Sequence, residues 1–169
     1  NQVILNQEDV EKQLEQADVI VPKKRRYYIE TLYSHYSNTH DSSHLDETRK
    51  VISELTPDYL TSYDKVMKQN SGYMFNMFIM SKELTDRYCS WLFPIIKELY
   101  ERIDVSEYTP FEARLFGRIS ELLFNVWIVE NELTVKEMPF IYMDKVDFIR
   151  KLKSFLFAKF FNQKYGKSF

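Results

Sequence analysis

Four polar side chains interrupt the most apolar stretch of the sequence at the spacing of one helical face. Arg114, Arg118, Glu121 and Asn125 follow one another at intervals of four, three and four residues. Such intervals place side chains on one stripe of a helix, and the apolar residues on both sides predict that the stripe is at least half buried. A carboxylate there could accept a proton or hold a sugar hydroxyl, and guanidinium groups could bind an anion. A surface salt bridge with no chemical role would explain the same spacing.

Three more residues belong to the same predicted helix. Gly117 lies beside the stripe, where the missing side chain would let a ligand or another backbone approach closely. Glu121 shares its face with arginines, and nearby positive charge favours the ionised form of a carboxyl group, so we expect Glu121 to be ionised. Trp127 is expected to pack in the core rather than to stack on a sugar.

Asn76 is the only strongly polar residue in the apolar run from Tyr73 to Met80. The run predicts a central strand, on which Asn76 would share one face with Met74 and Phe78. Its buried amide would need hydrogen-bond partners. These are either neighbouring backbone groups or the hydroxyls of a ligand at the end of the strand.

Three histidines, His35, His40 and His44, lie within ten residues and beside Asp41 and Asp46. Histidine and aspartate are common metal ligands, but this spacing matches no known ligand pattern, so it favours a solvated turn over a metal site. His40 stays a candidate for binding substrate.

A basic run, Lys23 to Arg26, comes directly after the short β-branched segment that ends at Pro22. Ligands of open α/β sheets bind just beyond strand ends, so Lys24 and Arg25 are candidates for binding a phosphate. A solvent-facing basic cluster is the alternative.

The elements that position these residues are mostly helices. Three glycines and five prolines against thirteen phenylalanines and twelve tyrosines indicate long helices with aromatic packing and disfavour a β-sandwich. We predict a helix-rich α/β fold and a single domain, residues 1–169. The predicted helices cover residues 7–17, 27–36, 43–55, 57–69, 81–102 with a kink or split at Pro94, 110–131, and from 144 onward; the predicted strands cover 18–22, 73–80 and 138–142.

Composition excludes several classes of protein. The formal net charge of −2 gives no overall attraction to nucleic acid. No apolar run is long enough to span a membrane, and the lone Cys89 cannot form an internal disulfide and fits a reducing compartment. We therefore expect a cytoplasmic protein. Because the sequence begins at Asn1 without Met and leads directly into an amphipathic pattern, we also expect it to be a longer polypeptide that has lost its start.

The C-terminal segment, residues 145–169, predicts a basic helix with an aromatic side. From Lys145 to Lys167 it has seven lysines and arginines against Asp147 alone, a local charge of +6. A basic flank beside an aromatic face is typical of a helix that binds anionic lipid. A helix covering the core, with lysine stems lying along it, is the alternative. The segment also supports an alternative function, a non-enzymatic helical module that docks on a membrane or a protein partner.

Two long blocks of the sequence resemble a known family. The blocks are SGYMFNMFIMSKELTDRYCSWLFPIIKELYERIDVSEY and FEARLFGRISELLFNVWI, and an earlier segment, DVIVPKKRRYYIETLYSHY, matches as well. They are similar to bacterial capsular and exopolysaccharide glycosyltransferases, long catalogued as a domain of unknown function and grouped with GT-A type transferases.

The resemblance implies a partial GT-A-like fold and transfer of a sugar from a nucleotide-diphospho-sugar to a growing, lipid-linked glycan. An inner-membrane location, with the enzyme peripheral on the cytoplasmic face, would follow from such an acceptor. Family members carry an earlier segment of the type VHYRRYF, which this sequence lacks together with any Asp-x-Asp. A divalent cation, Mg or Mn, would therefore have most of its ligands outside these residues.

Residues of this sequence that match the family's motifs are His40, Asn76, Arg114, Gly117, Glu121 and Trp127. The chemistry of sugar transfer suggests a role for each polar one. An inverting transferase needs a carboxylate to deprotonate the acceptor hydroxyl, and a retaining one needs stabilisation of positive charge at the anomeric carbon, so Glu121 is the catalytic candidate. Asn76 and His40 would orient hydroxyls, and Arg114 or Arg118 would bind phosphate or hold Glu121.

Overall fold

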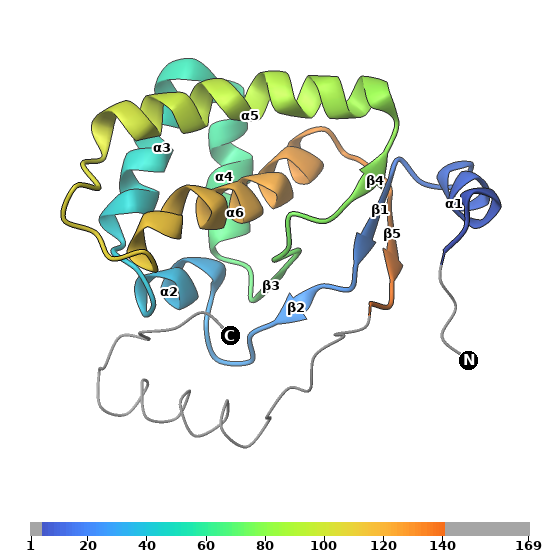
Figure 1. The fold of residues 1–169 in the computed structure, drawn as a ribbon, viewed down its shortest axis with the longest axis horizontal. Helices are drawn as coiled ribbons and strands as arrows, with labels where there is room; N and C mark the ends of the chain where they lie inside the picture. The colour runs from blue at the N-terminus through green and yellow to red at the C-terminus, as the bar shows by residue number, and fades with distance from the viewer. Residues whose placement is uncertain (1–4, 141–169) are drawn as a thin grey trace.

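A small mixed sheet lies at one end of the molecule and a group of helices at the other (Figure 1). The computed structural model describes residues 5–140. The central strand of the sheet is β1 (Val19–Pro22), which pairs antiparallel with β4 (Ile79–Met80) and parallel with β5 (Val135–Met138). All four residues of β1 are buried, as a strand covered on both faces should be. The predicted strand over 18–22 is thus confirmed.

A second, two-stranded ribbon follows β1 directly. Its strands are β2 (Arg25–Arg26) and β3 (Ser71–Gly72), and Arg25 pairs with Gly72 in antiparallel register. The ribbon brings the basic run after β1 next to the segment after α4 (Figure 1), and its Gly72 lies against Asn125 of the long helix near the C-terminal end of the described chain.

The helices agree with the predicted pattern in number and order over the described residues. They are α1 (Gln7–Leu14), α2 (Leu32–Ser37), α3 (Ser43–Leu55), the short 3₁₀ turn η1 (Pro57–Tyr59), α4 (Leu60–Met67), α5 (Lys82–Arg102), a second 3₁₀ turn η2 (Glu112–Arg114) and α6 (Leu115–Glu130). Asn6 caps α1 through a capping box with Asp9, and Ser81 caps α5.

α6 lies inside the helical group, where it packs against α4 and α5. Most of its side chains are buried, because apolar residues occupy nearly its whole circumference. Trp127 is 1% exposed and contacts the ring of Tyr88 on α5, with 5.1 Å between centroids. The expected core role of Trp127 is therefore confirmed.

The predicted central strand over 73–80 is wrong. Only Ile79–Met80 is a strand, and the residues between Gly72 and Ile79 are irregular. The side chain of Asn125 binds the backbone N–H and C=O of Tyr73, so this stretch bonds to a helix side chain instead of a neighbouring strand. Asn76 is consequently exposed and not on a buried strand face.

Other predicted boundaries also shift. The helix predicted from residue 27 begins at Leu32, because the N–H groups of Tyr27 and Leu32 donate to the carbonyls of Asn70 and Gln69 and hold this stretch extended. The helix from residue 110 becomes regular only at Leu115, after η2. The strand predicted at 138–142 lies at Val135–Met138, in register with β1.

Pro94 does not split α5, which continues through it for 21 residues. Proline has no N–H, so the carbonyl of Ser90, four residues earlier, has no helical partner. Pro94 and Ser90 are both exposed, so this carbonyl is not left unpaired in the core. Within the described part of the chain, no helix combines the length and the apolarity that crossing a membrane requires. The predicted C-terminal helix, residues 145–169, lies outside the described residues.

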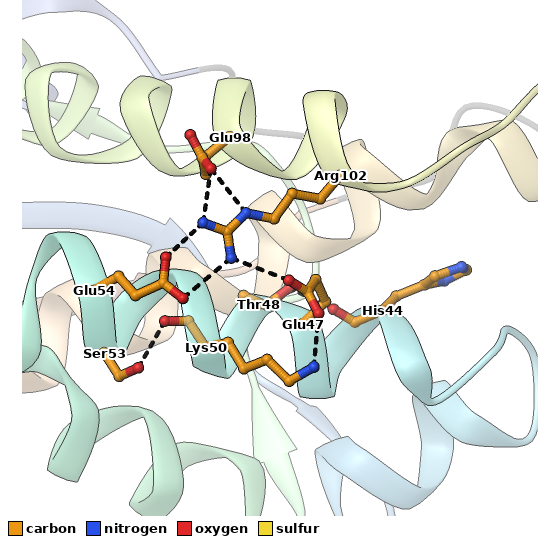
Figure 2. A network of polar contacts seen from close by, with 8 residues as sticks. All are labelled: His44, Glu47, Thr48, Lys50, Ser53, Glu54, Glu98 and Arg102. Carbon is orange, nitrogen blue, oxygen red and sulfur yellow. Dashed lines mark hydrogen bonds and ion pairs between the residues drawn. The ribbon is translucent and has the colours of Figure 1, made fainter.

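One arginine joins α3 to α5 (Figure 2). Arg102 contacts Glu47 at 3.1 Å and Glu98 at 2.7 Å, and it also pairs with Glu54. Hydrogen bonds from Lys50 and then from Arg102 lower the pKa of the Glu47 carboxyl group, and a hydrogen bond from Arg102 lowers the pKa of Glu54. Three carboxylates therefore lie close together, and the positive charge of Arg102 offsets the repulsion between them.

We expect Arg102→Met to lower the thermal unfolding midpoint, and to do so more at low salt than at about 1 M salt, because the remaining carboxylates repel and salt screens that repulsion. Thermal unfolding followed by circular dichroism would measure this. Lys97→Met is the control, since the pair of Lys97 with Glu101 is exposed and 3.9 Å long. A loss independent of salt would show that repulsion is not the cause.

Candidate functional site

The polar stripe on α6 contains an ion pair at the edge of the core. Arg118 Nη1 lies 3.3 Å from Glu121 Oε2, and the two side chains are 27% and 14% exposed. They are half-buried as the flanking apolar residues predicted. Arg114 precedes them at the end of η2 and is exposed. The stripe thus extends from solvent at Arg114 into the core at Asn125.

Burial decides the protonation behaviour of Glu121. Loss of solvent raises the pKa of its carboxyl group above the ordinary value, while Arg118, Arg114 and Arg25 each lower it. The effect expected from the arginines is present, but burial outweighs it. Glu121 is therefore a better proton acceptor than an exposed glutamate, because a carboxylate with a raised pKa holds its proton more tightly.

Arg25 of β2 brings the basic run within electrostatic range of Glu121. Its guanidinium lies over the ring of Tyr27, 5.4 Å from the centroid, and its charge acts on both Glu121 and His35. Lys24 instead lies over the ring of Tyr73, 4.9 Å from the centroid. Of the two predicted phosphate-binding residues, Arg25 therefore acts on the α6 stripe, and Lys24 packs on a neighbouring ring.

A buried carboxylate and a histidine complete this cluster. Glu30 is 9% exposed, and its oxygens accept hydrogen bonds of 2.8 Å from His35 Nδ1 and from Asn38 Nδ2. The His35 ring lies against the Tyr27 ring, with 4.0 Å between centroids. We call Arg25, Tyr27, Glu30, His35, Arg118 and Glu121 the polar cluster; it joins β2, the segment before α2, α2 itself and α6.

Sequence reasoning missed Tyr27, Glu30 and His35 as members of a site. His35 was placed in a solvated turn with the other histidines, and residues 27–31 in a helix. One local signal was available: Thr31 and Ser34 form a capping box, which starts the helix at Leu32 and leaves Glu30 ahead of it. The contact with α6 has no local signal, because it depends on the β2–β3 ribbon.

Asn125 fixes that ribbon to α6. Its Oδ1 accepts from the Tyr73 N–H at 2.7 Å, and its Nδ2 donates to the Tyr73 carbonyl at 3.0 Å and to the Glu121 carbonyl at 2.8 Å. Gly72 of β3 lies against it, since a Cβ there would be 3.1 Å from Asn125 Oδ1 and 3.0 Å from Leu32. The close approach that requires glycine is therefore at Gly72.

Asn76 lies beside the first turn of α6. Its Nδ2 donates to the Gly117 carbonyl at 3.3 Å, one helical turn before Glu121. Gly117 is exposed, and a Cβ there would meet nothing within 4 Å, so the described residues leave open space beside the stripe. This geometry brings Asn76 to the helix that carries Arg114, Arg118 and Glu121.

His40 and His44 form a separate aromatic group. His40 is 5% exposed and stacks on Phe111, with 5.1 Å between centroids. His44 contacts the hydroxyls of Tyr36 at 3.0 Å and Tyr108 at 2.8 Å. The three histidines thus have three different environments. Among residues 5–140, no three His, Cys, Asp or Glu side chains are grouped so that they could hold a metal ion.

Comparisons with known proteins identify a related family and a related fold. The model of the family described as Domain of unknown function (DUF4422) matches residues 1–132. Among solved structures, the apo structure of the bifunctional glycosyltransferase WbbM matches with a TM-score of 0.75 and 29% sequence identity. The match covers 79% of this chain and 25% of that chain, so the present chain spans a quarter of the protein it resembles. The search of curated proteins gave no match.

The fold is therefore a helix-rich α/β fold similar to part of a glycosyltransferase. The resemblance to a glycosyltransferase family is confirmed at this level.

We expect Asn125→Ala to lower the free energy of unfolding by about 2 kcal/mol, because it leaves the buried N–H and C=O of Tyr73 without their partner. Urea unfolding would measure the loss. Asn76→Ala is the matched control, since it removes one exposed amide bond and should change the free energy of unfolding by less than about 0.5 kcal/mol. Equal losses in the two variants would refute the structural role of Asn125.

Proposed function

We propose a sugar-transfer function for this chain, on the premise that it belongs to the DUF4422 family. The chain would be part of a glycosyltransferase that moves a sugar from a nucleotide-diphospho-sugar to a glycan acceptor. The similarity to WbbM supports the reaction class. The polar cluster supports the location of the site. There, a half-buried carboxylate with a raised pKa has three arginines acting on it.

Each group in the cluster would have a definite part in the reaction. The acceptor hydroxyl attacks the anomeric carbon, the bond from that carbon to the diphosphate oxygen breaks, and the hydroxyl proton passes to the Glu121 carboxylate. Arg118, Arg114 and Arg25 would bind the diphosphate, whose negative charge grows as it leaves. Lys24 would add positive charge at the edge of this site.

Asn76 would hold a hydroxyl of the donor or the acceptor. Its amide is exposed beside the open space at Gly117, so a sugar can reach it. His40 lies behind Tyr36 and Phe111, so a sugar would contact it only after these rings move. We therefore propose Asn76 as the more direct contact of the two.

Further details of the proposal come from the family resemblance. They are a GT-A type fold, capsular or exopolysaccharide synthesis, a lipid-linked acceptor and a site at the inner face of the cytoplasmic membrane. A divalent cation, Mg or Mn, would support the diphosphate in such an enzyme. Residues 5–140 do not fit this ion, because they hold no group of ligands for it, so its ligands would come from outside these residues.

We expect Glu121→Gln in the intact enzyme to lower kcat by about 100-fold or more, since the amide cannot accept the proton. The release of nucleoside diphosphate would be measured for a panel of nucleotide-sugars. Glu130→Gln is the control on the same helix, because its oxygen can still accept the Ser62 hydroxyl far from the polar cluster. Normal turnover by Glu121→Gln would exclude Glu121 as the proton acceptor.

The segment from Lys145 to Lys167 is proposed as a membrane-binding element. Each basic residue near an anionic surface adds about 1 kcal/mol, so a local charge of +6 can hold a protein on a membrane without spanning it. We expect the chain to cosediment with anionic vesicles but not with neutral ones, and to be released by salt. A chain ending at Asp144 should not bind. Equal binding by the two chains would favour packing over anchoring.

A further inference from the structure

The carboxylate of Glu30 controls which nitrogen of His35 carries the proton. An ionised carboxylate can only accept hydrogen bonds, and Glu30 Oε2 lies 2.8 Å from His35 Nδ1. Nδ1 must therefore carry the hydrogen in the neutral ring, which leaves the lone pair on Nε2. Glu30 is itself held by Asn38 through its other oxygen. The pair is thus a fixed arrangement with one acceptor directed away from Glu30.

The His35 ring is rigidly placed and still accessible. It lies on the Tyr27 ring, and its side chain is 21% exposed. Nε2 has no hydrogen-bond partner among the residues that the structure describes. A hydrogen-bond acceptor that is oriented, partly desolvated and unpaired is suited to bind a hydroxyl of a ligand.

The surrounding charges keep this nitrogen an acceptor. Burial lowers the pKa of His35 most, and the charges of Arg25 and Arg118 lower it further, whereas Glu30 raises it. Tyr27 is the other titratable group at the ring, and burial raises the pKa of its hydroxyl. The imidazole therefore keeps its neutral form to a lower pH than an ordinary histidine, which is half protonated at about pH 6.5.

Glu30, though not His35, is one of the residues that line an open hollow of about 520 Å³. This volume lies within the range of small-molecule sites, about 300–1,000 Å³. Its lining is rich in hydrogen-bonding side chains, among them Thr31, Gln69 and Asn70, and it includes Tyr28, which is 91% exposed. Amide and hydroxyl groups beside an exposed aromatic ring suit the hydroxyls and the apolar ring face of a sugar.

We propose that Glu30 and His35 form a sugar-binding subsite in which His35 Nε2 accepts a hydrogen bond from a ring hydroxyl of the donor or acceptor sugar. This inference rests on the proposed glycosyl transfer and deepens it. His35 contacts substrate, and Glu30 is a positioning residue that acts by fixing the tautomer. The charges of Arg25 and Arg118 act on His35, so the sugar would lie within electrostatic range of the groups proposed for the diphosphate.

Three substitutions separate the parts of this proposal. His35→Asn places an amide near the position of Nδ1, so it keeps the bond to Glu30 but loses Nε2. His35→Gln places an amide oxygen near Nε2 and should restore much of the binding. Glu30→Gln can donate to Nδ1, which moves the imidazole proton to Nε2 and turns the acceptor into a donor.

We expect His35→Asn and Glu30→Gln to raise KM about tenfold with kcat changed much less, and His35→Gln to stay near the wild-type KM. The substrate is whichever of a panel of nucleotide-diphospho-sugars the intact protein turns over, and thermal unfolding is measured for each variant. An unchanged KM in His35→Asn would overturn the subsite. So would a KM in His35→Gln as high as in His35→Asn at equal stability.

Nitrogen NMR of the imidazole tests the subsite without turnover. In the wild-type chain we expect the Nδ1–H form, a pKa below 6.5, and a shift of the Nε2 resonance when free glucose, galactose or their nucleotide-sugars are added. In Glu30→Gln the pKa should fall further. If none of the sugars shifts the Nε2 resonance, the subsite is overturned even in an active enzyme. A shift without any sugar transfer would support the subsite and refute the transfer function.

Discussion

The burial of α6 is the constraint on which the other elements depend. A helix that is apolar around most of its circumference is stable only when neighbours cover it, and α4 and α5 provide that cover. Each large side chain removed from water contributes about 1.5–3 kcal/mol, and residues such as Leu122, Leu123 and Val126 are at most 1% exposed. The edge with Arg118 and Glu121 reaches solvent in part, as do the two ends of the helix. The polar cluster lies there because the covering elements end there.

A neutral amide determines where the charges of the cluster meet. Asn125 binds both backbone groups of Tyr73, which holds β3 against α6, and β3 in turn pairs with the strand that carries Arg25. Backbone pairing therefore places the Arg25 guanidinium near enough for its charge to act on Glu121, although no direct contact between the two side chains is described. The geometry of the polar cluster and the packing of the core therefore depend on the same side chain, Asn125.

Local patterns in the sequence predicted the helices well because capping and periodicity are local properties. The helix starts predicted at residues 7 and 81 agree with the caps at Asn6 and Ser81, and the four-three-four spacing placed Arg118 and Glu121 on one half-buried face. The strand predicted from Tyr73 to Met80 was wrong because apolar content cannot distinguish a strand from a segment that is hydrogen-bonded to a helix side chain. His35 and Glu30 were missed because their neighbours on α6 are about 85 residues away, and nothing local records such contacts.

The order of strands in the sheet has a consequence for synthesis on the ribosome. β1 is fully buried, yet its parallel partner β5 lies more than a hundred residues later; the Asp18 and Thr134 side chains that join their starts are 116 residues apart. At about 5–20 residues per second, β1 emerges on the order of ten seconds before β5. Its apolar edge stays open to other chains during that interval. The helices α3 to α5 can form meanwhile, but α6 ends at Glu130, just before β5 begins at Val135, so the burial of α6 and the closing of the sheet come together at the end of synthesis.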